Sequence, residues 1–84
     1  MINSLYFNYK IPTKLLIFKT NINTKKKVKA LKSFFDSHTS ITKWSIDLED
    51  IDNVLKIEAA IGLNESNMID QIKTQGFYCD VLSD

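Results

Sequence analysis

The sequence has no arginine and only one cysteine, one proline and two glycines among its 84 residues. Without guanidinium groups the chain cannot grip a phosphate or carboxylate bidentately, which argues against a specific nucleic-acid reader. The lone cysteine, Cys79, cannot form an internal disulfide, so we expect a reducing compartment and no disulfide framework. With only Gly62 and Gly76, the chain has no glycine-rich loop to cradle a nucleotide.

Long hydrophobic runs are also missing. No apolar run approaches the ~20 residues that span a membrane, and the first ten residues lack a basic segment followed by an apolar one. We therefore expect a soluble, cytoplasmic protein without a membrane partner. The 44% apolar and 25% charged content is ordinary for a folded domain, and the length allows one such domain.

Charge is unevenly distributed along the chain although the net charge is only +1. Residues 1–43 contain nine lysines and one acidic residue, Asp36, whereas residues 44–84 contain two lysines and nine acidic residues. Fields of this kind orient partners rather than set a fold, and salt screens them over about 8–10 Å. We expect electrostatics to contribute to any association.

Residues 1–12 end at Pro12 and are interpreted as an N-terminal arm or edge extension, with the domain itself over residues 13–84. Residues 15–18 form a short apolar run that predicts a strand. A helix then follows, with Thr24 as its cap and a polar stop over residues 36–40. Its apolar positions recur at three- and four-residue spacing, at Val28, Leu31, Phe34 and Phe35.

The second half of the chain repeats this order. Alternation predicts a second strand with one apolar face at Trp44, Ile46 and Leu48, a turn over residues 49–53, and a third strand with Leu55, Ile57 and Ala59 on one face. Asn64 is a candidate cap for a second helix with the apolar stripe Met68, Ile69 and Ile72, and Gly76 is its end. A last strand places Phe77, Cys79 and Val81 inward.

The predicted order is strand, helix, strand, strand, helix, strand. This pattern is typical of the α+β class with a ferredoxin-like βαββαβ arrangement. Right-handed crossovers then place both helices on one face of a four-stranded antiparallel sheet.

Four segments resemble the heavy-metal-associated domain of copper chaperones and metal-pumping ATPases. They are Phe18-Lys19-Thr20-Asn21-Ile22, Trp44-Ser45-Ile46-Asp47-Leu48, Val54-Leu55-Lys56-Ile57-Glu58, and the set Ile69, Ile72, Gly76 and Phe77. The resemblance implies the same ferredoxin-like fold and electrostatic docking to other domains near the loop after the first strand. Family members carry a Cys-x-x-Cys metal motif in that loop.

Counting from Ile22 and Val28 without gaps places the two family thiol positions at Thr24 and Lys27. Copper(I) and zinc are held by thiolates, a threonine hydroxyl is a poor ligand for soft metals, and an ammonium group repels the ion. We therefore expect the metal site of the family to be lost, with no metal bound at this loop and no cofactor.

Lys25, Lys26 and Lys27 oppose the dipole of the predicted helix at its start, at about 0.3–1 kcal/mol each. One interpretation is that the Lys27 ammonium group satisfies loop carbonyls and orders the loop without a metal. The preferred interpretation is simpler, with all three lysines solvated on the first turn of the helix.

Three further features have ordinary structural interpretations. Cys79 is expected to be a small buried hydrophobe. His38, beside Asp36, is expected to be a solvated cap at the helix end that interacts with the terminal carbonyls. Glu49, Asp50 and Asp52 lack calcium-loop spacing and are expected to form a solvated turn. No catalytic set can be assembled from one histidine and one cysteine on separate elements, so no enzyme is predicted.

The leading functional prediction is a non-catalytic module that binds another protein, or pairs with itself through complementary basic and acidic surfaces. The predicted interaction surface is Lys25, Lys26, Lys27, Lys29 and Lys32. The alternative is a copper- or zinc-handling protein with atypical ligands, such as Cys79 with His38 or a second chain. Nucleic-acid binding is a weaker rival because the inner strands lack the aromatic signature of RNA readers and the acidic half repels phosphate.

Overall fold

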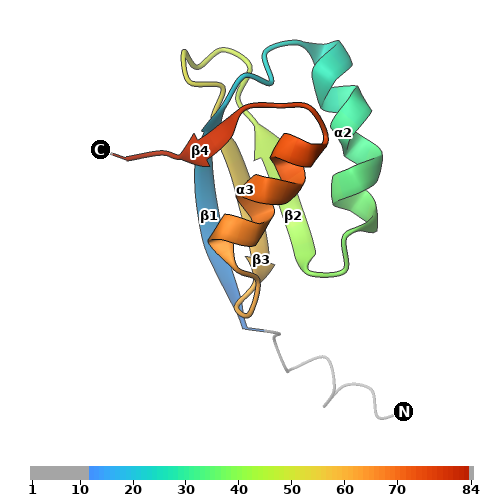
Figure 1. Ribbon diagram of the computed structural model, residues 1–84, viewed down its shortest axis with the longest axis vertical. Helices are drawn as coiled ribbons and strands as arrows, with labels where there is room; N and C mark the ends of the chain where they lie inside the picture. Colours follow the sequence, from blue (N-terminus) through green and yellow to red (C-terminus); the bar gives the residue numbers. More distant parts are fainter. Residues whose placement is uncertain (1–11, 84) are drawn as a thin grey trace, which may run out of the picture.

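The computed structural model describes residues 12–83, and its elements follow the predicted order (Figure 1). They are β1 (Thr13–Thr20), α2 (Lys25–Ser37), β2 (Ile41–Ile46), β3 (Leu55–Ala60), α3 (Glu65–Thr74) and β4 (Cys79–Val81). The strands form one antiparallel sheet in the order β2-β3-β1-β4. The α+β, ferredoxin-like fold is thereby confirmed. The predicted arm falls almost wholly on residues 1–11, which lie outside the described residues.

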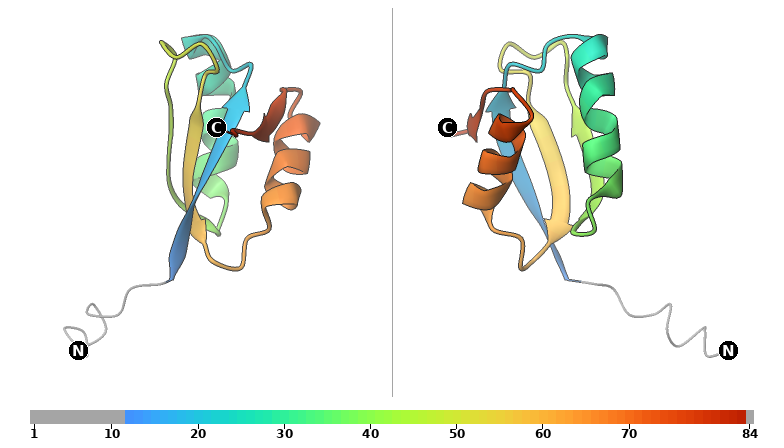
Figure 2. Two further views of the ribbon diagram at one scale, coloured as in Figure 1. Left: turned by 90° about the vertical axis from the view of Figure 1, so that its left-hand side faces the viewer. Right: turned by 45° about the vertical axis from the view of Figure 1, so that its right-hand side comes forward.

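Both helices lie against the same face of the sheet, as the two views of Figure 2 show. The core fills the space between these layers, and its centre is made by side chains that are wholly inaccessible to solvent. They include Phe18, Ile22, Leu31, Phe35, Leu55, Ile57, Met68, Ile72 and Cys79. The period-two and helical patterns of the sequence therefore predict most of these buried residues, whereas Ile22 lies in the β1–α2 loop and belongs to neither pattern.

The helix ends follow the predicted chemistry. Thr24 Oγ1 accepts a hydrogen bond of 3.1 Å from the backbone nitrogen of Lys27, and Asn64 Oδ1 accepts one of 3.1 Å from that of Asn67. At the end of α3, Gly76 has a φ of 98°, a left-handed conformation that favours glycine. Its N–H donates to the carbonyl of Lys73 at 2.9 Å, so the helix ends as a Schellman turn.

Two strand boundaries differ from prediction. β1 continues to Thr20, beyond the apolar run at residues 15–18, because the chain still pairs with β4 there. β2 ends at Ile46, so Leu48 is not on its inner face but lies in the following turn. The carboxylate of Asp47 accepts a 3.0 Å hydrogen bond from the Glu49 backbone, which turns the chain before a longer strand can form.

The last strand also departs from prediction at its end. Cys79 is buried and Phe77 packs against the core, but Val81 is 36% exposed. β4 is only three residues long and forms an edge of the sheet. Val81 is its last residue and is therefore less covered than Cys79 at its start. Neither helix in the described part of the chain is long and apolar enough to cross a membrane.

Candidate functional site

Three connecting segments meet at one end of the sheet, where β1 leads into α2 (Figure 1). The backbone nitrogen of Thr20 donates to the carbonyl of Asp52 at 2.9 Å, which joins the β1–α2 loop to the β2–β3 loop. The side-chain oxygen of Asn21 accepts a 2.9 Å hydrogen bond from the backbone nitrogen of Tyr78, which joins the same loop to the α3–β4 turn. The β1–α2 loop is therefore fixed from both sides.

Thr20 is the buried polar residue at the centre of this arrangement, with 7% of its surface exposed. Its hydroxyl donates to the carbonyl of Asn53 at 2.7 Å and accepts from the backbone nitrogen of Ile22 at 3.1 Å. Asn53 has a φ of 42°, a left-handed conformation that asparagine tolerates better than most residues. Sequence reasoning missed this contact because nothing in the local pattern links residues 33 positions apart.

Lys27 differs from its neighbours because its side chain turns back toward the loop. Its Nζ donates to Asn23 Oδ1 at 2.9 Å and to the carbonyl oxygen of Asn21 at 3.4 Å. The contact expected of the alternative interpretation is therefore present, while Lys27 lies on the first turn of α2, as the preferred interpretation has it, and both hydrogen bonds are exposed to solvent. Thr24 Oγ1 caps the helix by accepting a hydrogen bond from the Lys27 backbone. The side chains at both positions that correspond to the family's thiols, Thr24 and Lys27, therefore make hydrogen bonds in this structure.

The other lysines of the predicted surface lie on the exposed side of α2. Lys25, Lys26 and Lys29 are solvent-exposed, and no salt bridge within residues 12–83 involves them. Lys32 pairs with Asp36, although 65% of its side chain remains exposed. Within residues 12–83, the predicted surface thus consists of three cations without an ion pair, the ion-paired Lys32, and Lys27, whose side chain contacts the loop.

Asp36 anchors the far end of α2 to the sheet. Its Oδ1 accepts a 2.9 Å hydrogen bond from the indole nitrogen of Trp44, whose ring centroid lies 4.8 Å from that of Phe35. Hydrogen bonds from Lys32 and from Trp44 lower the pKa of this carboxyl group below its usual value. Asp36 therefore stays ionised and compensates Lys32, which explains why the free cations gather toward the start of the helix.

Cys79 is confirmed as a buried core residue. Burial raises the pKa of its thiol to about 12, and the neighbouring Asp80 carboxylate adds to the effect. The group is consequently a protonated thiol at neutral pH, whereas a metal ligand or nucleophile must be a thiolate.

His38 is the C-cap of α2, as predicted, and its backbone N–H donates to the carbonyl of Phe35 at 3.2 Å, but the residue is partly buried rather than fully solvated. Its Nε2 lies 3.0 Å from Gln71 Oε1, and its Nδ1 accepts a 3.2 Å hydrogen bond from the backbone nitrogen of Ser40. The ring joins the end of α2 to α3 and makes no hydrogen bond to the helix carbonyls. Metal binding by His38 would require one of these two bonds to break.

Acidic side chains in the β2–β3 loop shape the turn. Asp50 Oδ1 accepts a 2.8 Å hydrogen bond from the backbone nitrogen of Asp52, as Asp47 does for Glu49. Within the part of the chain that the structure describes, no three histidine, cysteine or acidic residues are grouped to hold a metal ion.

No model of a known protein family matches the sequence, and no curated protein matches it. Inferences about function therefore depend on the arrangement of the loop and of α2.

Proposed function

We propose that this protein is a non-catalytic interaction module that binds an acidic protein surface through Lys25, Lys26 and Lys29. One observation carries the proposal: three exposed ammonium groups lie at the start of one helix, with no carboxylate paired to them within residues 12–83. The first turn of α2 contains no acidic residue. The helix dipole is positive at this end, so an acidic partner would stabilise both the side chains and the helix.

The charges would act mainly on the rate of association. Complementary charges at the rim of an interface raise the association rate and make it sensitive to salt, with smaller effects on dissociation. We therefore expect binding that weakens steeply between low and physiological salt. The loop held by Thr20 and Lys27 would keep the start of α2 in one orientation, which lowers the entropic cost of docking.

The experiment compares two variants that lose the same number of charges. Lys25→Gln, Lys26→Gln and Lys29→Gln are combined in one protein, and Lys10→Gln, Lys14→Gln and Lys73→Gln in the control. Each is used as bait for cross-linking and mass spectrometry in extracts of the native cells, at low and physiological salt. A partner with an acidic contact surface should be lost by the first variant alone. Equal loss with both variants would contradict the proposal.

We also infer that the chain derives from a heavy-metal-associated domain whose metal site has been replaced by a tethered ammonium group. The ferredoxin-like fold supports this inference, and so does the Lys27 side chain, which reaches from the first turn of α2 back to the loop after β1. A direct test restores the thiols by combining Thr24→Cys with Lys27→Cys. The restored variant should bind one zinc or copper(I) ion, while Thr24→Ala with Lys27→Met should bind none. Absence of metal uptake by the folded dithiol variant would contradict it.

A further inference from the structure

The face of the sheet opposite the helices is open, since residues 12–83 place no element over it (Figure 2). Its central row contains Ser45, Lys56 and Ile17, which the strand register sets side by side. Leu82 continues this row, because its backbone nitrogen donates to the carbonyl of Ile17 at 3.2 Å. The row divides the open face into two halves with different shapes and charges.

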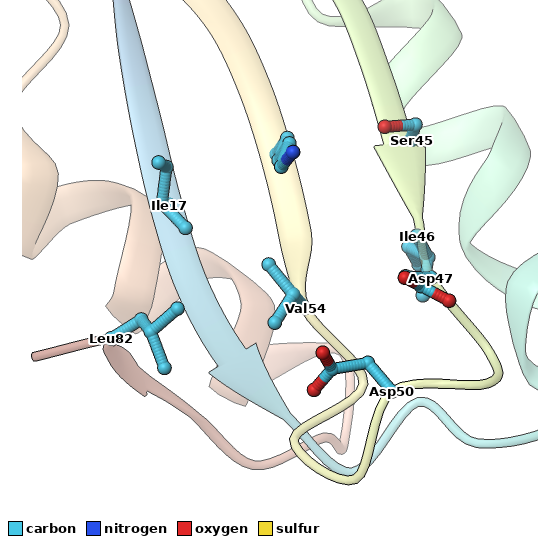
Figure 3. Close-up of a pocket in the computed structure, with 8 residues that line it drawn as sticks. Ile17, Ser45, Ile46, Asp47, Asp50, Val54 and Leu82 are labelled. Atoms are coloured by element: carbon cyan, nitrogen blue, oxygen red, sulfur yellow. The ribbon is translucent and has the colours of Figure 1, made fainter. Parts of the chain in front are cut away.

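One half is a hollow of about 440 Å³ beside the β2–β3 loop (Figure 3). Ile17, Val54 and Leu82 form its apolar lining. Asp47 and Asp50 supply carboxylates at its rim, and Figure 3 shows the Asp50 carboxylate beside Val54. This half therefore combines an apolar floor with negative charge.

The other half presents a protruding apolar residue together with a cation and a carboxylate. Leu15 is 59% exposed and lies opposite Glu58 on β3, and Glu58 lies opposite Lys43 on β2. A smaller hollow of about 230 Å³ adjoins these residues. Lys43 and Asp47 lie two residues on either side of Ser45, so they are placed symmetrically about the central row.

We propose that a second copy of this chain covers the open face, related by a two-fold axis that runs along the central row between two facing sheets. Such an axis exchanges the two halves. Lys43 of each copy then faces Asp47 of the other, with Asp50 nearby, and each Leu15 lies over Lys19 beside Val54 of its partner. A contact of this kind is isologous, because the same patch serves both copies. Sheets that pack in this way lie about 10 Å apart.

A two-fold axis parallel to the strands would instead bring Asp47 over the β4 end of the partner's face. Asp80 lies at that end, opposite Lys19 in the strand register. Charge complementarity therefore favours the axis along the central row. The two Lys56 side chains meet near the proposed axis; Lys56 lines the larger hollow together with Asp50 and the smaller hollow together with Glu58. The face spans roughly 400 Å² per copy by strand spacing and rise. The two copies together would bury about 800 Å², which is below the roughly 1,200–2,000 Å² of stable specific complexes, so the dimer should be weak and form at micromolar or higher concentration.

Sedimentation analysis with reciprocal charge reversals tests the proposal. The wild-type protein should shift with concentration from the 9.7 kDa of one chain toward twice that mass. Lys43→Asp alone and Asp47→Lys alone should each remain monomeric, because each places like charges at both contacts. An equimolar mixture should dimerise again, since both contacts become complementary. Lys29→Asp on α2, with the same charge change, should dimerise like the wild type.

Each other outcome would overturn the proposal. A wild-type protein that stays monomeric at the highest attainable concentration would show that no second copy covers the face. A wild-type dimer with a mixture that remains monomeric, both variants being folded by circular dichroism, would place the interface elsewhere. Loss of dimer with Lys29→Asp would point to α2 instead. Lys43 and Asp47 are not part of the α2 surface, so this test is independent of the proposed binding of an acidic partner by α2.

Discussion

The hydroxyl of Thr20 donates a 2.7 Å hydrogen bond to the carbonyl of Asn53, across 33 residues of sequence. This contact ties the end of β1 to the loop between β2 and β3. The same hydroxyl accepts from the backbone of Ile22, so one buried side chain satisfies groups in two loops. The position of the β1–α2 loop relative to the sheet depends on this residue.

Replacing Thr20 with valine keeps the volume and removes the hydroxyl. The Asn53 carbonyl and the Ile22 N–H lose their partner, so we expect a loss of about 1–3 kcal/mol in the free energy of unfolding. Urea denaturation of the variant and wild type measures the difference. Thr13→Val is the matched control, because Thr13 is exposed on the same strand. A loss no larger than that of the control would contradict a role for the Thr20 hydroxyl.

The alkaline limit of stability should depend on Cys79. Burial raises the pKa of this thiol from its ordinary 9.0 to about 12 in the folded protein. The unfolded chain therefore loses the proton first, so stability is complete below pH 9 and falls as the pH rises toward 12, at about 1.4 kcal/mol per unit. Denaturation at several alkaline pH values measures this slope.

The control for that slope is Cys79→Ala, which removes the ionisable group from the same position. The variant should be less stable at neutral pH because a buried atom is lost, but it should show a shallower alkaline decline than the wild type. Identical slopes for the two proteins would mean that other groups cause the decline.

His38 should carry its proton on Nε2 when its ring is neutral. The backbone N–H of Ser40 donates to Nδ1, which leaves Nε2 to donate to Gln71 Oε1. Nitrogen-15 chemical shifts of the imidazole, recorded at alkaline pH, distinguish the two tautomers. Observation of the Nδ1–H form would contradict this arrangement. Gln71→Leu should leave the tautomer unchanged, because the Ser40 contact remains.

Much of the fold could be predicted because its signals are local. Thr24, Asn64 and Gly76 mark helix ends by capping chemistry within a few residues, and the inward face of β3 follows from strict alternation. The correct set of elements in the correct order then leaves few topologies available.

The features that were missed depend on contacts between distant segments. His38 meets Gln71 and Thr20 meets Asn53 only after the chain has folded, so no spacing rule indicates either pair. Val81 follows the alternation, yet its exposure is set by the short edge strand. Within the candidate site, the sequence predicted which lysines lie on the helix but could not decide which of them turned toward the loop.

That distinction separates Lys27, whose side chain contacts the loop, from Lys25, Lys26 and Lys29 of the same helix, and it is the central claim. Lys27→Met and Lys26→Met each remove one cation from the first turn of the same helix, so dipole effects are matched. Only the former removes hydrogen bonds, to Asn23 and Asn21, which we expect to be worth about 0.5–1 kcal/mol.

The most direct measurement is the backbone heteronuclear NOE of residues 21–24 in these two variants, together with their unfolding free energies. Lys27→Met should lower the NOE values in the loop and the stability, while Lys26→Met should leave the loop unchanged and the stability equal or slightly higher. Indistinguishable loops in the two variants would contradict the claim that the Lys27 ammonium group orders this segment.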